Sequence, residues 1–169
     1  PAIRRAPRTD VRALAELGAA TFVEAFGQLY TKEDLATFLA IAHTVARYDR
    51  LIREPNIAIW LATLENAPAI GFVVAGSCRL PVVNREAGAG EIRQLYVRAG
   101  HQTHGLGTRL LETALEWLAA QNQAPLYVGV WSGNCGAQRL YERYGFEKIG
   151  EYHFPVGKQL DLEYIFRSR

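Results

Sequence analysis

The stretch EIRQLYVRAGHQTHGLGTRLLETALEWL, residues 91–118, predicts a strand, a glycine-rich turn and a helix in direct succession. Its first residues form a short apolar and β-branched run, typical of a strand in a covered sheet, that ends near Val97. Leucine and alanine then recur at helical spacing over residues 110–118. Gly105 and Gly107 therefore lie where a helix begins.

A glycine-rich turn at a helix N-terminus favours binding of an anion. The first four N–H groups of a helix have no partner inside it, and the helix dipole adds the equivalent of about half a positive charge. Glycines at 105 and 107 remove the Cβ atoms that would keep a phosphate away from these groups. The turn is thus a candidate phosphate site, with an ordinary strand-to-helix turn as the alternative.

Two familiar nucleotide motifs do not match this turn. A Walker loop closes on Gly-Lys-Ser/Thr, whereas Gly107 is followed by Thr108 and Arg109. A dinucleotide fingerprint needs a third glycine where Leu110 stands and an acidic residue after the next strand, which instead runs into Trp131. A nucleotide-binding protein is therefore disfavoured.

The motif that remains is Gln102-x-x-Gly105-x-Gly107, preceded by a strand written LYV. It resembles the pyrophosphate loop of the GCN5-related N-acetyltransferases, in which backbone amides hold the diphosphate of acetyl-CoA. The resemblance implies that acetyl-CoA is the co-substrate, with no metal. It implies a loop made of Gln102, Thr103, His104, Gly105, Leu106, Gly107 and Thr108.

A second family pattern, Asn-x-x-Ala-x-x-x-Tyr-x-x-x-Gly-Phe, is matched without a gap from Asn134 to Phe146. The resemblance implies that Asn134 binds the pantetheine arm and that Tyr141 is the acid that protonates the departing sulfur. A phenol with a pKa near about 10 is protonated at neutral pH and can donate to a thiolate. The alternatives are an N-cap for Asn134 and a core aromatic for Tyr141.

The strand before the loop has two further implied roles. The backbone of Leu95, Tyr96 and Val97 would pair with the pantetheine arm like an added strand. A lysine-like amine is protonated at neutral pH, and removing its proton costs about 4.6 kcal/mol, so a base is needed. Glu91 stands where many family members place such a base. Glu91 and Leu95 share a face of the strand unless a bulge intervenes. A surface glutamate is the alternative.

The order of elements also matches the acetyltransferase family. The first quarter of the chain reads as helical, residues 57–75 as a hairpin, and the last residues as a closing pair of strands in which apolar residues alternate with Asp161 and Glu163. The resemblance implies the family's α/β fold. This fold is a mixed, mostly antiparallel sheet flanked by helices, with a V-shaped opening between the fourth and fifth strands.

The length of the chain predicts one domain over residues 1–169. The formal net charge is +2 with scattered basic residues, so we expect no nucleic-acid partner. Cys78 and Cys135 lack metal-type spacing, which argues against a metal site. No apolar run is long enough to span a bilayer, so we expect a cytoplasmic enzyme without a membrane partner. Trp60 and Trp131 are expected in the core.

The acceptor is predicted from a narrower similarity. The segments TFVEAF, HGLG and LYERYGF make the chain similar to bacterial PaiA-type spermidine/spermine N-acetyltransferases. This similarity implies a polyamine or another small primary amine, and Glu24, Glu33 and Asp34 would supply negative charge on the acceptor side. Acetylation of a protein N-terminus, an amino acid or an antibiotic, a non-catalytic acyl-CoA binding module, and a homodimer all stay open.

Overall fold

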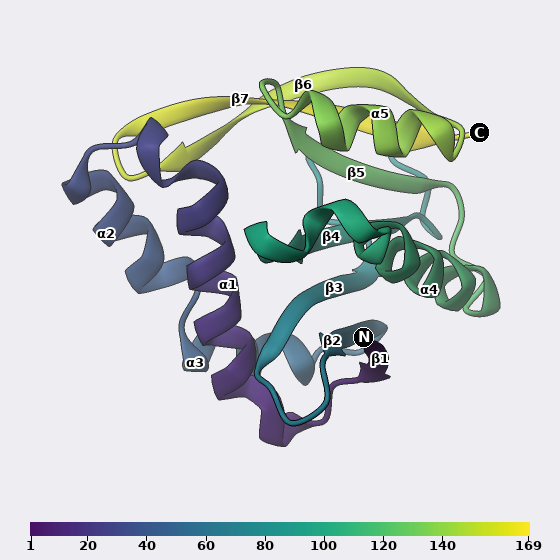
Figure 1. Cartoon of the computed structure of the whole chain (residues 1–169). Helices are drawn as coiled ribbons and strands as arrows, with labels where there is room; N and C mark the ends of the chain where they lie inside the picture. The colour runs from purple at the N-terminus through teal and green to yellow at the C-terminus, as the bar shows by residue number, and fades with distance from the viewer.

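The structure, a computed structural model, describes residues 1–102 and 104–169, and its strands join in one sheet (Figure 1). The strands are β1 (Ala2–Arg5), β2 (Ile57–Thr63), β3 (Ala69–Ser77), β4 (Gly90–Val97), β5 (Leu126–Trp131), β6 (Phe146–Val156) and β7 (Gln159–Ser168). The helices are α1 (Val11–Phe26), α2 (Lys32–Ala42), α3 (Val45–Ile52), α4 (Leu106–Ala120) and α5 (Cys135–Arg143). Short 3-10 helices are η1 (Arg8–Asp10), η2 (Gly27–Leu29) and η3 (Ala99–His104).

The sheet runs in the order β1-β2-β3-β4-β5-β7-β6. Neighbouring strands are antiparallel except β4 and β5, which are parallel and pair only at Gly90 with Leu126 and at Glu91 with Tyr127. Beyond Glu91 the two strands diverge, which produces a V-shaped opening in the middle of the sheet (Figure 1). The predicted mixed, mostly antiparallel fold with this opening is confirmed.

Helices cover both faces of the sheet, as the wide apolar runs of β2 and β3 require. On one face, Leu110, Leu111 and Leu118 of α4 and Tyr141 of α5 are buried in the largest core cluster. On the other face, residues of α1 and α3 form a second cluster against β2 and β3. Figure 1 shows α1, α2 and α3 grouped at one side of the molecule, beside the open end of β4.

Local sequence signals explain where several elements begin and end. The Thr31 hydroxyl accepts a hydrogen bond of 3.1 Å from the N–H of Asp34 and begins α2, as its capping pattern predicts. Gly145 follows α5 with a φ of 82°, the left-handed conformation that favours glycine after a helix. The predicted closing pair is confirmed as β6 and β7.

In the described part of the chain, no helix is both long enough and apolar enough to span a bilayer.

Candidate active site

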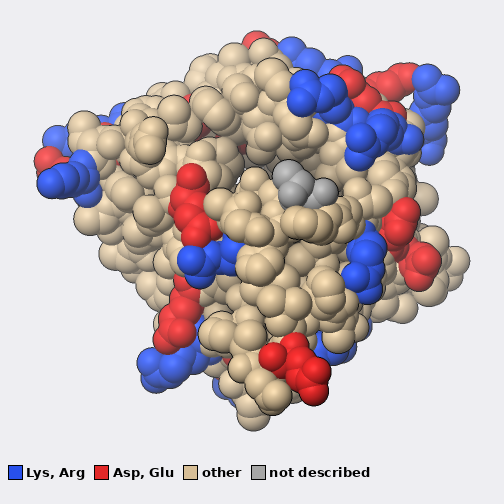
Figure 2. All heavy atoms as spheres, in the orientation of Figure 1, with Lys and Arg blue, Asp and Glu red and all other residues tan. Residues whose placement is uncertain are grey.

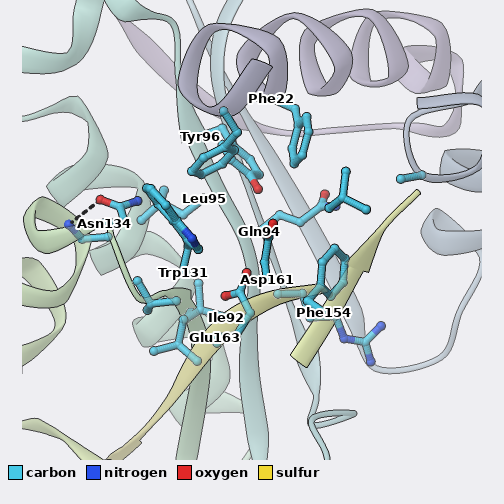
Figure 3. A pocket seen from close by; sticks show the side chains of 18 of the residues that line it. Phe22, Ile92, Gln94, Leu95, Tyr96, Trp131, Asn134, Phe154, Asp161 and Glu163 are labelled. Carbon is cyan, nitrogen blue, oxygen red and sulfur yellow. Dashed lines mark hydrogen bonds between the residues drawn. The ribbon is translucent and has the colours of Figure 1, made fainter. Parts of the chain in front are cut away.

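A cavity of about 310 Å³ lies where β4 and β5 diverge. Four residues with predicted site roles line it: Leu95 and Tyr96 from β4, Asn134 at the start of α5, and Tyr141 within α5. Figure 3 shows the first three of them. Residues from α1, α2, α3, β5, β6 and β7 complete the walls. The fold therefore brings the end of β4 and the Asn134–Tyr141 motif to one cavity, while residues 102–108 of the loop are not among its lining residues.

The open edge of β4 borders this cavity. Leu95, Tyr96 and Val97 pair with β3 on one side, whereas the pairing with β5 stops at Glu91. Backbone groups of β4 that point toward β5 beyond Glu91 thus have no partner in the β4–β5 ladder. An extended ligand can pair with this edge as an added strand, which is the role predicted for the three residues.

The glycine-rich loop follows β4 directly, through η3 and into α4. Gly105 has a φ of 70° and is the N-cap of α4, and the first hydrogen bond of the helix runs from the N–H of Arg109 to the carbonyl of Gly105, at 3.0 Å. In the described residues no side chain caps this helix. A Cβ at Gly105 would meet nothing within 4 Å, and one at Gly107 only Val97 Cγ2 at 4.0 Å. The surface over the first turn is therefore open to a ligand.

The other predicted loop residues are placed as follows. The Gln102 side chain donates to the carbonyl of Val97, at 3.0 Å, and so stiffens the exit from β4. His104 ends η3, Leu106 is buried, and Thr108 lies in the first turn of α4. Thr103 lies outside the described residues. The loop geometry agrees with an anion site at the N-terminus of α4, and its use for a diphosphate stays a prediction.

An ion pair fixes the loop against α1. The Glu24 carboxylate lies 2.6 Å from the Arg98 guanidinium and accepts a hydrogen bond of 3.0 Å from the N–H of Ala99.

The other two acidic residues predicted for the acceptor side are Glu33 and Asp34. Asp34 accepts a hydrogen bond of 2.8 Å from the N–H of Lys158, and Glu33 is exposed. Because Glu24, Glu33 and Asp34 are absent from the cavity lining, they do not supply the negative charge expected there.

Tyr141 is buried, with 5% of its surface exposed, and its ring packs against Phe146 with centroids 5.8 Å apart. In the described residues its hydroxyl has no hydrogen-bond acceptor, although the side chain lines the cavity. Burial raises the pKa of the Tyr141 phenol, so it stays protonated across the neutral range. The Tyr144 hydroxyl, by contrast, donates to Glu112 at 2.7 Å, outside the cavity.

Asn134 acts as the N-cap of α5, because its Oδ1 accepts a hydrogen bond of 3.1 Å from the N–H of Ala137 (Figure 3). This bond uses the side-chain oxygen and leaves the two N–H donors of the amide facing the cavity side of the helix start. The capping alternative is thus real, and it is compatible with the predicted contact to pantetheine.

Glu91 lies outside this cavity. A β-bulge at Arg93 interrupts the pairing of β3 with β4, so that Val74 faces Gln94 while Ala75 faces Ile92. The extra residue reverses the alternation and places Glu91 on the opposite face of β4 from Leu95. The sequence had left this choice open.

Glu91 lines a second cavity of about 340 Å³, and the two cavities share Ala42, Arg47, Arg93, Gln94, Tyr152 and Phe154. The carboxylate is 7% exposed and accepts a hydrogen bond of 2.8 Å from the N–H of Arg79. Burial raises the pKa of Glu91. Glu91 is therefore not among the residues that line the first cavity.

Two carboxylates that the sequence did not single out, Asp161 and Glu163, line the first cavity from β7 (Figure 3). Asp161 is 6% exposed and accepts hydrogen bonds from the Tyr30 hydroxyl and from Gln159 Nε2. Glu163 is half-buried, and in the described residues it has no hydrogen bond or ion pair. Burial and then the charge of Asp161 raise the pKa of Glu163 to about 7.

Aromatic rings form much of the remaining wall. Trp131, expected in the core, instead lines the cavity and meets Phe26 edge to face at 5.9 Å, so that expectation is wrong. Trp60 is 8% exposed and belongs to the core, as expected. Gly133 is the feature of the sequence that relates to this position of Trp131. A Cβ at Gly133 would overlap the indole, so a glycine leaves room for the ring. The result is a cavity with an apolar, aromatic wall and two acidic groups at its base.

The surface around the site carries charges of both signs. Figure 2 shows acidic and basic side chains interspersed on this face, with Lys and Arg gathered over α5 and the C-terminal end of the chain. In the described residues, no three His, Cys, Asp or Glu side chains are arranged to hold a metal ion.

The fold and the site define a class of acyltransferase, and comparison with known proteins identifies the family. Residues 21–146 match the model of the acetyltransferase (GNAT) family, so the chain belongs to this family. It is an acetyl-CoA-dependent N-acetyltransferase.

Relatives and neighbours agree with this assignment. An uncharacterized N-acetyltransferase of Lactobacillus delbrueckii is 26% identical, over 94% of this chain and 91% of its own length. An uncharacterized N-acetyltransferase of Mycobacterium bovis is 28% identical, over 93% of this chain and 96% of its own length. The structure of PaiA N-acetyltransferase from Thermoplasma acidophilum, solved with coenzyme A, has a TM-score of 0.77 at 16% identity and covers 99% and 98% of the two chains. That likeness supports the fold.

Proposed function

We propose that this enzyme transfers the acetyl group of acetyl-CoA to a primary amine of a small molecule, a polyamine of the spermidine type. The amine attacks directly while both substrates are bound. One observation carries the proposal: the open edge of β4, Asn134 and Tyr141 border one cavity, and β4 leads straight into the open N-terminus of α4.

The binding roles follow from this arrangement. The amides of residues 102–108 would hold the diphosphate, since no Cβ covers Gly105 or Gly107. The backbone of Leu95, Tyr96 and Val97 would pair with the pantetheine arm, and an N–H of this edge would stabilise the thioester oxygen as negative charge develops. The amide of Asn134 would donate to the arm from the opposite wall.

The proton transfers need an acid and a base. Tyr141 is the acid, because its phenol is protonated at neutral pH and its side chain lines the cavity, with no acceptor for the hydroxyl among the described residues. The base role implied for Glu91 requires a chain of water from the second cavity, because its carboxylate lies on the other face of β4.

The acceptor prediction rests on charge. An ammonium group is attracted to a site with two carboxylates and several aromatic faces, and the cavity offers both. Asp161 and Glu163 supply the negative charge on the acceptor side that a polyamine needs. These residues support the polyamine prediction in place of Glu24, Glu33 and Asp34.

A second acceptor class is favoured by Arg47. This arginine of α3 lines the same cavity and, in the described residues, forms no ion pair. A guanidinium binds carboxylates well, so an amino acid or a peptide, which carries an anionic group as well as an amine, also fits.

An acetyl-CoA consumption assay against polyamines, amino acids, peptides and aminoglycosides separates these acceptors. We expect turnover with spermidine and spermine. Turnover confined to amino acids or peptides, with loss of that turnover in Arg47→Gln, would replace the polyamine with the second class. No turnover with any amine would leave a non-catalytic acyl-CoA binding module.

A further inference from the structure

We infer that Glu163 is the catalytic base that meets the ammonium group of the acceptor and takes its proton before the amine attacks. This assignment rests on the proposed function and names a residue that no family motif points to. Its basis is the position of the carboxylate within the cavity that holds Tyr141.

The pairing of strands places Glu163 beside the opening. In the antiparallel register of β5 with β7, Glu163 lies opposite Trp131, the last residue of β5 and a wall of the cavity. Two residues along β7, Asp161 points to the same side of the sheet. Figure 3 shows both acidic side chains at the base of the cavity, across from Leu95 and Tyr96 of β4. A base and an acid thus line one space.

The two carboxylates have different partners, and this difference assigns their roles. Asp161 is held by the Tyr30 hydroxyl and by Gln159, so its oxygens are already used. Glu163 has no such partner in the described residues and is free to bind an ammonium group. Asp161 is therefore a positioning residue, a fixed negative charge beside the base, and Glu163 is the group that exchanges the proton.

The charged and titratable groups around Glu163 come from every neighbouring element. Asp161 lies on its own strand, and its charge together with burial accounts for the raised pKa of Glu163, about 7. The groups that face the cavity from other elements are Tyr30, His43, Arg47, Arg93, Tyr96, Tyr141 and Tyr152. A base with this pKa is about half ionised at neutral pH, which suits general base catalysis.

The proton balance is complete with these residues. Glu163 takes one proton from the ammonium group, and the neutral amine forms its N–C bond to the thioester carbon. The C–S bond breaks, and the sulfur receives the phenolic proton of Tyr141. The nitrogen then loses its second proton, which restores the phenol, and Glu163 releases its proton to solvent. One proton is set free for each acetyl group transferred.

The test is the pH dependence of kcat/KM for the acceptor in Glu163→Gln and in Glu91→Gln. For the unaltered enzyme we expect kcat/KM to rise with pH as Glu163 ionises, near its pKa of about 7. This rising part of the pH profile is called the limb. Glu163→Gln should lose this limb and lower kcat/KM by about 10²-fold or more, with unchanged affinity for coenzyme A. Glu91→Gln should keep the limb.

Two further variants separate a catalytic role from a structural one. Asp161→Asn removes the neighbouring charge, so the limb should move to lower pH, a shift that a packing defect would not produce. Glu151→Gln makes the same chemical change at an exposed residue of β6 and should leave the profile unaltered.

The assignment would be overturned if Glu163→Gln kept both the normal kcat/KM and its rise with pH. It would also be overturned if Glu91→Gln, and not Glu163→Gln, lost that rise. Failure of the unaltered protein to acetylate any amine would count against the proposed function itself and is thus distinguishable.

Discussion

The indole of Trp131 meets the ring of Phe26 edge to face, with centroids 5.9 Å apart and planes at 80°. This contact joins the end of β5 to the end of α1 and closes the aromatic wall of the cavity. Edge-to-face pairs are worth about 0.5–1.5 kcal/mol beyond their buried area, so the contact also stabilises the wall.

Trp131→Ala should weaken acceptor binding and leave coenzyme A binding intact. We expect KM for the acceptor to rise about 10-fold, the equivalent of about 1.4 kcal/mol. Gly133→Ala should act in the same direction, because the added Cβ would overlap the indole. Gly136→Ala is the matched control, since a Cβ there meets only Asn134 Oδ1 at an ordinary 3.9 Å. Equal KM values for all four proteins would remove Trp131 from the acceptor site.

Tyr141→Phe should reduce kcat by about 10²-fold or more, because the sulfur would leave without a positioned acid. Its affinity for coenzyme A should stay the same, since the phenyl ring keeps its packing against Phe146. Tyr144→Phe is the control, as its hydroxyl bonds to Glu112 outside the cavity. If Tyr141→Phe turns over at the normal rate, another group supplies the proton.

Gly105→Ala should lower both stability and coenzyme A affinity. An L-residue in the left-handed conformation that Gly105 adopts costs about 1–2 kcal/mol, and relief of this strain would move the loop amides. Gly100→Ala should be nearly neutral, because Gly100 has no positive φ and its Cβ would meet nothing within 4 Å. Thermal unfolding and calorimetric titration measure the two effects. Equal behaviour of the two variants would show that the left-handed turn is dispensable.

The raised pKa of Glu163 also predicts how stability depends on pH. Its folded pKa of about 7 lies above the ordinary 4.5, so the folded state binds the proton more tightly than the unfolded state. Stability from this group therefore falls as pH rises from the ordinary pKa to the folded one. Glu163→Gln lacks this loss and should unfold at an equal or higher temperature than the unaltered protein at alkaline pH. A lower unfolding temperature there would show that the ionised carboxylate stabilises the fold.

Much of this fold follows from local sequence patterns. The Thr31 cap, the helix end at Gly145 and the strand-loop-helix unit around Gly105 each have a local physical cause, and the structure confirms their placement. Asn134 and Tyr141 could be predicted because one motif fixes their spacing, and the fold brings both to one cavity.

The two carboxylates at the bottom of the cavity, Asp161 and Glu163, could not be predicted in the same way. Alternation along β7 predicts a strand, but it does not say which face is covered. Asp161 is 6% exposed while its neighbour Leu160 is 63% exposed, the reverse of the usual pattern. The cause is the divergence of β4 and β5, a long-range feature that turns the polar side of β7 into a cavity wall.

The bulge at Arg93 could not be predicted either, because the residue types of a strand do not show that it contains one extra residue relative to its partner strand. It decides the position of Glu91, and with it the choice between two bases.

The central claim is that the open N-terminus of α4 binds the diphosphate of the coenzyme. Calorimetric titration of the unaltered protein with coenzyme A, 3′-dephospho-coenzyme A and pantetheine tests it most directly. We predict one site per chain for both diphosphate compounds and a large loss of affinity for pantetheine, which lacks the diphosphate. Equal affinity for pantetheine and coenzyme A, or no binding of either, would contradict it.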